Sequence, residues 1–533
     1  MYLPRVRFSG ALFIAAFALS ACGGSGSSKT ATASNGPKLV VARVKDSVSL
    51  DPALASDGMS LNVTQEVMKG LVDFKLGTFE IEPQIARSWQ MSPDGRTWTF
   101  LLRSGLTFSD GTPIDAAAVK FNFDRWRLIS SPYHADFSYP YYASMFGGFP
   151  GLVADVEAPK ADTVVFTLTR PFAPFLHDLA MPSFAIGSPK AIRDDLRGFA
   201  QHPVGYGPYV LSEWVKDDHV TLAASSNYPV HAAYTTVTLR EIGDQPAAVA
   251  AMQDGSADIL SDPAPGDALA LGKQPAFTVY FQPANNNSYL AMNLDRPPFE
   301  KLGVRQAIAY AVDVRGIVKS FYPKGALVAD NWTPAGMLGE NPAVKAYPFD
   351  PAKGKALLAA AGYPKGFATQ LLYPTVPRPY LTQPQRVAET IRAELGAIGI
   401  AVALEPLEWA AFLKKVHNGE HAMCLVGWSG DNGDPDNFMY TLLDRDAAHR
   451  PNAQNYTFWR DEKFHDLMIA GQVTSDNVKR AEIYREANAM IGAMVPAIPI
   501  VHVTVPIVVR SSIAGFVPTP DTHIAFEYLH PKS

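Results

Sequence analysis

Hydrophobic and polar positions alternate along several stretches of the chain in the manner of β-strands. Trp98–Arg103 alternates with a period of two and follows Ser92–Gly95, where proline fixes φ and glycine accepts a positive φ. Leu39–Val44 and Thr163–Leu168 have the same strand character, and the first is apolar almost throughout. A strand of that kind is typical of a sheet covered on both faces.

Other stretches repeat their apolar positions every three to four residues, which predicts helices. One helix begins at Asp350-Pro351 and ends at Gly362, since proline suits the first helical position and glycine the end. A second begins at Pro384, and a third covers Asn477 to Met494. Their apolar faces consist of Val387, Ile391 and Leu395 in the second and Ile483, Ala487 and Ile491 in the third. Because strands and helices intermix along the chain, the fold class is α/β or α+β.

The N-terminus carries a different pattern. A short basic region with Arg5 and Arg7 precedes the apolar run Ala11–Leu19, which is too short to span a membrane and fits a signal-peptide core. The run ends in Leu19-Ser-Ala-Cys22, which resembles a bacterial lipobox, where cleavage before the cysteine is followed by lipid attachment to its thiol. We therefore predict a lipoprotein signal peptide at 1–21, and a lipid anchor at Cys22 with a flexible Gly/Ser-rich linker over 22–37.

Composition narrows the classes further. The chain has 533 residues, 47% hydrophobic and 18% charged, with a net charge of -5 and no marked basic patch, which argues against a nucleic-acid partner. The only cysteines are Cys22 and Cys424, so a disulfide scaffold is excluded. Cys424 lies in the apolar run Met423–Trp428, where an inert buried thiol is expected.

Motifs of common enzymes are missing. No phosphate-binding Walker sequence and no His-Glu-x-x-His sequence occurs. His417 and His421 flank Asn418-Gly419, which favours a turn over a two-histidine helical metal site. Gly427-Trp-Ser-Gly-Asp431 differs from a nucleophile elbow in its last residue. We expect no catalytic residue, no metal and no cofactor.

The segment Gly427–Asn437 is unusual. It contains three carboxylates and three glycines directly after an apolar strand. Close carboxylates repel each other unless cations or hydrogen-bond donors are near. A solvated acidic loop and a pocket that receives a cation are both compatible with this pattern.

An ordered series of motifs resembles the peptide/nickel class of extracellular solute-binding proteins of ABC importers. The series comprises Leu50-Asp-Pro52, Pro83–Trp89, Ser92–Gly95, Leu102–Gly105, Phe108–Gly111, Pro203–Tyr209, Val304–Ala307 with Ala311–Asp313, and Phe349–Pro364. The resemblance implies a two-lobed periplasmic-binding-protein fold. The expected large lobe is 38–283 plus 502–533, with an extra subdomain at about 74–215, and the expected small lobe is 284–501. Within the large lobe, residues 130–200 receive no functional assignment.

The likeness narrows to the dipeptide-binding branch of this family. It implies that Asp431 receives the ammonium of a dipeptide, that Arg378 receives its carboxylate, and that Tyr380, Gly427 and Trp428 line its backbone. The chemistry agrees, because a guanidinium matches a carboxylate and a carboxylate accepts from an ammonium. Without the resemblance, Arg378 could equally form a surface ion pair or cap the helix that begins at Pro384.

The predicted function is therefore a lipid-anchored, extracytoplasmic, monomeric receptor that delivers dipeptides to ABC permease subunits. Within the same family, a receptor for haem, for longer peptides or for antimicrobial peptides is the alternative. An extracytoplasmic peptide hydrolase and a sensory or chaperone lipoprotein remain rivals from other classes.

Overall fold

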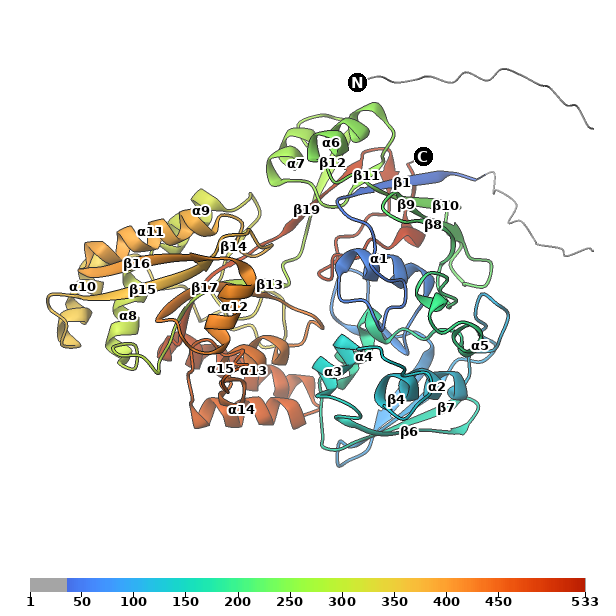
Figure 1. Ribbon diagram of the computed structural model, residues 1–533, viewed down its shortest axis with the longest axis horizontal. Helices are drawn as coiled ribbons and strands as arrows, with labels where there is room; N and C mark the ends of the chain where they lie inside the picture. Colours follow the sequence, from blue (N-terminus) through green and yellow to red (C-terminus); the bar gives the residue numbers. More distant parts are fainter. Residues whose placement is uncertain (1–35, 533) are drawn as a thin grey trace, which may run out of the picture. The chain divides into compact units, whose positions relative to one another are not determined.

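The computed structural model describes residues 36–532, which contain two separate large β-sheets (Figure 1). The predicted signal peptide at 1–21, the lipidation site Cys22 and most of the predicted linker 22–37 lie outside these residues. Within 36–532, no helix combines the length and apolar composition needed to cross a membrane.

The first sheet has seven strands, and its central strand β1 (Lys38–Arg43) pairs in parallel with both neighbours. The sheet order is β12 (Phe277–Gln282), β19 (Val505–Arg510), β11 (Ile259–Leu260), β1, β10 (Thr236–Glu241), β9 (His219–Ala224) and β8 (Tyr209–Val215). Helices α6 (Gln245–Asp254) and α7 (Pro265–Leu271) pack on one face. Helices α1 (Gly58–Val67) and α5 (Pro189–Asp194) pack with the C-terminal segment on the other. Coverage on both faces explains the apolar character of β1.

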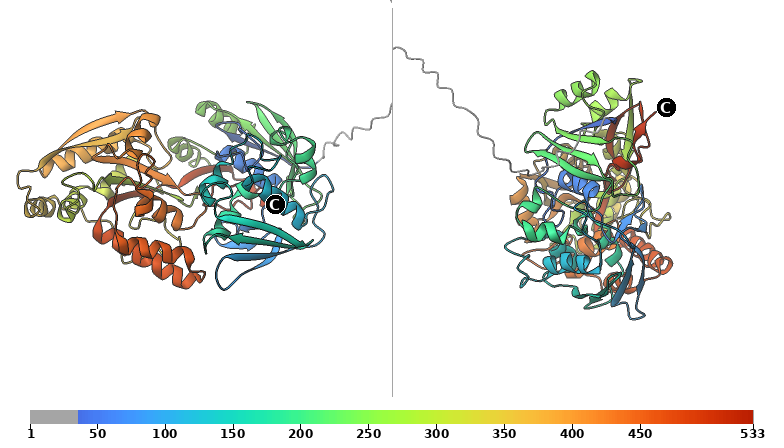
Figure 2. Two further views of the ribbon diagram at one scale, coloured as in Figure 1. Left: turned by 60° about the horizontal axis from the view of Figure 1, so that its bottom comes forward. Right: turned by 90° about the vertical axis from the view of Figure 1, so that its right-hand side faces the viewer.

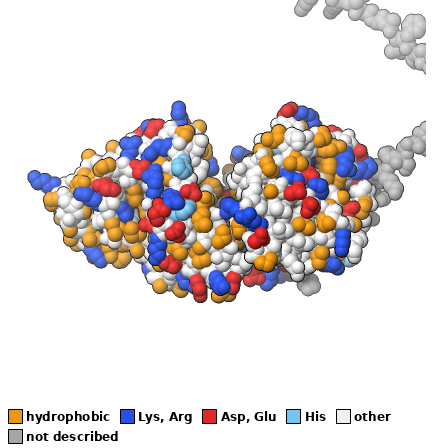
Figure 3. Space-filling model, turned by 90° about the horizontal axis from the view of Figure 1, so that it is seen from below, with side chains coloured by type: hydrophobic (Ala, Val, Ile, Leu, Met, Phe, Trp, Pro, Cys, Tyr) orange, Lys and Arg blue, Asp and Glu red, His pale blue; other side chains and the backbone are white. Residues whose placement is uncertain are grey.

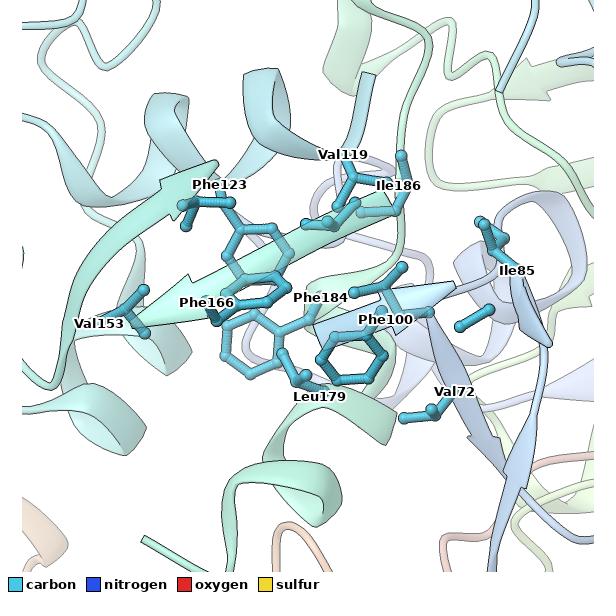
Figure 4. Close-up of a cluster of buried hydrophobic side chains, with 14 of the residues drawn as sticks. Val72, Ile85, Phe100, Val119, Phe123, Val153, Phe166, Leu179, Phe184 and Ile186 are labelled. Atoms are coloured by element: carbon cyan, nitrogen blue, oxygen red, sulfur yellow. The ribbon is translucent and has the colours of Figure 1, made fainter. Parts of the chain in front are cut away.

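A four-stranded antiparallel sheet is inserted between the first and later strands of this lobe. Its order is β4 (Ala86–Met91), β5 (Thr97–Leu102), β7 (Thr163–Leu168) and β6 (Val153–Lys160). Helices α2 (Ala116–Arg127), α3 (Pro140–Phe146) and α4 (Phe175–Ala180) complete its core. In β5 every second residue is buried, as its alternation predicts, and Phe100 meets Phe166 of β7 edge to face at 5.5 Å (Figure 4).

The second lobe is built on a six-stranded mixed sheet. Its order is β14 (Leu327–Val328), β18 (Ala497–His502), β13 (Asn286–Met292), β17 (Met423–Ser429), β15 (Phe367–Pro374) and β16 (Ile400–Leu407). Helices α8 (Leu302–Ala311), α9 (Val314–Phe321), α10 (Pro351–Ala360) and α11 (Pro384–Ala397) lie on one side. Helices α12 (Trp409–His417), α13 (Asp436–Leu443), α14 (Glu462–Val473) and α15 (Asn477–Met494) lie on the other. The chain passes between the two large sheets only at 282–286 and at 502–505 among the described residues (Figures 1 and 2).

The predicted helices are present, with one correction. Asp350 caps α10, its side chain accepting from the backbone N–H of Lys353 at 2.9 Å. In α15 the buried residues include Tyr484, Ala487 and Ile491, whereas the predicted Ile483 is only half-buried. Tyr484 points inward because its hydroxyl accepts a hydrogen bond from buried Arg480 at 3.1 Å. Cys424 is fully buried in β17, and burial raises the pKa of its thiol far above the usual range.

Candidate functional site

Three parallel strands of the second sheet end at one edge of that sheet. Strands β15, β16 and β17 run in the same direction, so their carboxyl ends lie together. The segments that follow them carry Arg378, Trp409 and Asp431 respectively. Ligand sites of open α/β sheets form at the carboxyl ends of strands, and this edge is the corresponding position.

The loop after β17 has a defined conformation. Asn285, at the entrance to β13, accepts from Gly430 N–H at 2.7 Å and donates its side-chain amide to Gly430 O at 2.8 Å. The side chain of Asn437, in the first turn of α13, accepts from the Trp428 indole at 2.9 Å and from the Asp431 backbone at 3.1 Å. These contacts hold Trp428 and Asp431 in fixed positions at the start of the loop.

Asp431 has neutral partners only. Its carboxylate accepts from the Asn437 amide at 3.0 Å and is hydrogen-bonded to the hydroxyl of Tyr141, which lies on α3 in the other lobe. Burial raises the pKa of Asp431 to about 6, although both hydrogen bonds oppose the rise. The charge of this carboxylate would therefore stabilise a cation bound beside it.

Arg378 lies in a tight turn. Its backbone exchanges both hydrogen bonds with Leu381, at 3.0 and 2.9 Å. Its guanidinium carbon lies over the Trp409 ring, 4.2 Å from the centroid, and its Nε is buried without an acceptor. Helix α11 begins after Gln383 and has no side-chain cap, so Arg378 does not cap it.

Tyr380 and Gly427 contact each other. A Cβ added at Gly427 would overlap the Tyr380 ring and the carbonyl oxygen of Asn287. Only glycine therefore allows buried Tyr380 to pack this closely against β17. This contact brings the turn with Arg378 onto the strand that carries the Asp431 loop.

A cavity of about 990 Å³ brings the predicted residues together. Arg378, Tyr380, Gly427, Trp428 and Asp431 all line it. The opposite wall comes from the first lobe, with Ser144–Phe146 of α3, the Gly147 that follows it, and Arg170, Phe172 and Asp178. Viewed from below, the surface is hollowed between the two lobes (Figure 3).

The other two carboxylates of the acidic loop have partners inside the protein. Asp434 forms a bidentate ion pair with Arg480 at 2.9 and 3.0 Å. Burial acts to raise the pKa of Asp434, but Arg480 outweighs it and the pKa is lowered. Asp436 accepts from the Gln472 amide at 3.0 and 3.2 Å, and burial with Asp434 nearby raises its pKa to about 7. Asp431 and Asp436 both line the cavity, but the Gln472 amide contacts both oxygens of Asp436. Of the three carboxylates, Asp431 is therefore the one in the cavity that has neither an ion pair nor an amide donor shared by both of its oxygens.

Contacts between the lobes border the cavity, and the sequence alone did not reveal them. Gln472 of α14 accepts from Arg170 at 2.8 Å through its side chain and from Ala173 N–H at 2.6 Å through its backbone. Arg170, Tyr141 and Asp178 all fall in 130–200, a stretch for which no function was predicted from the sequence. Trp409 was also missed. Its position just after β16, which runs parallel to β15 and β17, could have indicated that it lies near Arg378 and Asp431.

Side chains that could hold a metal occur away from these residues. Within residues 36–532, Asp444, Asp446 and His465 bring ligand atoms within 4.8 Å of one another. His465 Nδ1 already lies 3.0 Å from the Asp444 carboxylate, which also accepts from the Asp446 backbone. His417 and His421 both contact Tyr456, at its hydroxyl (3.1 Å) and its carbonyl oxygen (2.7 Å). These imidazoles are thus engaged in hydrogen bonds.

Comparison with known proteins agrees with a two-lobed binding protein. Residues 80–449 match the family model of bacterial extracellular solute-binding proteins, family 5. The dipeptide-binding protein of Escherichia coli (strain K12) is 34% identical over 492 residues, which cover 88% of this chain and 90% of that protein. Heme-binding protein A of Haemophilus influenzae is 32% identical over 536 residues, covering 97% of each.

Solved structures show the same fold. HbpA2 from Haemophilus parasuis superposes with a TM-score of 0.88 at 32% identity, covering 93% of this chain and all of that one. The binding protein DppA from Helicobacter pylori, solved with the peptide STSA, gives a TM-score of 0.74 at 32% identity over 93% and 98% of the chains.

The fold and its interlobe cavity define a substrate-binding protein of a transporter. The chain belongs to the bacterial extracellular solute-binding proteins of family 5, and such proteins act outside the cytoplasm. The family consists of binding proteins and not of enzymes.

Proposed function

We propose that the protein binds dipeptides as zwitterions, with the ligand's ammonium at Asp431 and its carboxylate at Arg378. Tyr380, Gly427 and Trp428 contact the ligand backbone between these two ends. The peptide-binding relatives from Escherichia coli and Helicobacter pylori support a peptide as the ligand class.

One observation carries the proposal. Asp431 and Arg378, 53 residues apart in the chain, line the same cavity, and neither forms an ion pair with another side chain in the described part of the chain. An unpaired charge removed from water is costly, and a partner of opposite charge relieves that cost. A ligand with one cationic and one anionic end satisfies both residues at once.

Ligand length follows from the two fixed anchors. An extended chain advances about 3.3–3.6 Å per residue, so a third residue moves one terminus past its anchor by that distance. Side chains of the dipeptide project into the remaining cavity, where water adapts to different sequences. The protein is therefore selective for length and tolerant of sequence.

Capture involves closure of the two lobes. We propose that 38–283 with 502–533 and 284–501 move as two bodies about the connections at 282–286 and 502–505. The ligand favours the closed state because only that state pairs both of its charges. The closed protein then delivers the dipeptide to an ABC permease, while a lipid on Cys22 retains it at the membrane.

Calorimetric titration tests the ligand. Ala-Ala, its N-acetylated and C-amidated forms and Ala-Ala-Ala are titrated into the wild type, Asp431→Asn and Arg378→Ala. The expected result is that the free dipeptide binds far more tightly than the blocked dipeptides and the tripeptide, and that this advantage is lost in both variants. Indifference to blocked termini would overturn the zwitterion model, and the release of free alanine would indicate a hydrolase. Mass spectrometry of the mature N-terminus tests the acylation of Cys22.

Haem is the second candidate ligand. The cavity of about 990 Å³ lies at the upper end of the roughly 300–1,000 Å³ typical of small-molecule sites, which leaves space for a ligand larger than a dipeptide. The relative from Haemophilus influenzae is named a heme-binding protein. Haemin titration, read by its absorbance change, distinguishes this candidate: tight binding that dipeptides do not displace would favour it.

A further inference from the structure

The guanidinium of Arg378 is supported by an aromatic ring. Its central carbon lies 4.2 Å from the centroid of the Trp409 ring. Trp409 in turn stacks on fully buried Phe412, with centroids 5.7 Å apart and an angle of 14° between the planes. The cation therefore lies on a ring that is itself fixed by the core.

The two segments that carry this pair are tied together. Thr375, at the start of the turn that contains Arg378, donates its backbone N–H to Leu407 O at 2.9 Å. Its hydroxyl donates to the Glu408 carboxylate at 3.0 Å. Leu407 ends β16 and Trp409 begins α12, so the relative position of Arg378 and Trp409 is set by the backbone.

No carboxylate competes for Arg378. Among residues 36–532, no Asp or Glu oxygen lies within 4.0 Å of its guanidinium, and its Nε is buried without an acceptor. Its other polar contact is with the hydroxyl of Tyr380. A carboxylate partner would have to be displaced by the ligand, whereas an aromatic face attracts the cation and leaves its N–H groups available.

We propose that Trp409 is a positioning residue, which holds the Arg378 guanidinium at a fixed distance from Asp431 and thereby sets the length of peptide that is bound. This inference rests on the proposed function of Arg378. The mechanism is geometric. A long arginine side chain that is free in the cavity could move to meet the carboxylate of a longer peptide. The Arg378 side chain cannot do so while it is stacked on Trp409. Trp409 lines the cavity, but the proposed contacts with the ligand do not include it.

Titrations of Trp409→Leu and Trp409→Phe with Ala-Ala, C-amidated Ala-Ala and Ala-Ala-Ala test this inference. A cation–π contact of about 0.5–2 kcal/mol corresponds to a loss of about 2- to 30-fold in affinity for the free dipeptide in Trp409→Leu. The weaker binding expected for the amidated dipeptide, which does not use Arg378, should stay unchanged. The preference for dipeptide over tripeptide should also fall in Trp409→Leu. Trp409→Phe should keep most of the wild-type affinity and most of the wild-type length preference.

Trp214→Leu is the matched control, because Trp214 also lies under a cation, Lys216 at 5.3 Å, but outside the cavity. Its dipeptide affinity should equal that of the wild type. Equal losses for the free and the amidated dipeptide in Trp409→Leu would show a general structural role and overturn the inference alone. A wild type that binds the two peptides equally well would overturn the proposed function, and this inference with it.

Discussion

The side-chain amide of Asn432 donates to the carboxyl group of Asp178 at 2.6 Å, although the two residues are 254 positions apart in the chain. Asn432 follows Asp431 in the acidic loop, and Asp178 belongs to α4 in the other lobe. Both side chains are buried, so the loop that carries the proposed ammonium site is attached to the opposite lobe at its base. The hydrogen bond is one of a group of polar contacts between the lobes that border the cavity.

Asp178 should make stability depend on pH. Burial raises the pKa of Asp178 well above its usual range, and the neighbouring carboxylates of Asp434, Asp436 and Asp431 add to this despite the Asn432 hydrogen bond. A carboxyl group whose pKa is raised by folding contributes its full stability below its unfolded pKa of about 3.9, and loses it as the pH rises toward the folded pKa.

Asp178→Asn mimics the protonated acid and should remove this loss. We expect thermal stability equal to the wild type at pH 4 and greater at pH 8, on the order of 1–3 kcal/mol. Thermal unfolding from pH 4 to pH 8 checks the prediction. A stability difference that is the same at both ends of this range would contradict it.

Dipeptide affinity should fall in mild acid. The proposed site needs ionised Asp431, whose pKa burial raises to about 6. The fraction ionised falls about tenfold between pH 7 and pH 5, so affinity should fall by about the same factor, while the ligand's own amine (pKa about 7.7–8.0) stays protonated.

Calorimetric titration at pH 5, 6 and 7 measures this dependence. Asp436→Asn is the control, because Asp436 also lines the cavity and its pKa is raised to about 7. The dependence should persist in Asp436→Asn, and the weak binding that remains in Asp431→Asn should not show it. If the pH dependence disappears in Asp436→Asn instead, the titrating group is Asp436 and the prediction for Asp431 is wrong.

The ion pair of Asp434 and Arg480 should be essential to the stability of the second lobe. Both side chains are almost fully buried, and their bidentate contact holds the acidic loop on α15. Arg480→Met leaves a buried charge without its partner and should cost about 3–5 kcal/mol of unfolding free energy.

Urea unfolding measures this cost. The double variant Asp434→Leu with Arg480→Met removes both charges and should be more stable than Arg480→Met alone. If the double variant is the less stable of the two, the ion pair is not the source of the effect.

Gly427→Ala should abolish dipeptide binding. The new methyl group overlaps the Tyr380 ring and Asn287 O, so the turn that carries Arg378 must move away from β17. Overpacking of this kind lowers the free energy of unfolding by about 1–3 kcal/mol.

Gly396→Ala is a matched control, because a Cβ there meets no atom within 4 Å and the residue lies in helix α11. It should bind normally and gain about 0.5–1 kcal/mol in stability. Titration and thermal unfolding of the two variants check both expectations. Normal binding by Gly427→Ala would show that Tyr380 and Arg378 do not depend on this contact.

The local elements and the family could be predicted from the sequence alone. The alternation in β5, the Asp350 cap of α10 and the apolar β17 depend on residues close in the chain, and all three are present. An ordered series of short motifs was sufficient to identify the family, and with it the two-lobed fold, which the comparisons confirm.

The environment of the site was decided by the tertiary structure. Three carboxylates within six residues look alike in sequence, and only contacts with Arg480, Gln472 and Tyr141 distinguish Asp434, Asp436 and Asp431. The inward turn of Tyr484 and the position of Trp409 under Arg378 likewise depend on segments far apart in the chain. Charge, burial and pKa at a site are set by such long-range neighbours, which periodicity and local motifs do not specify.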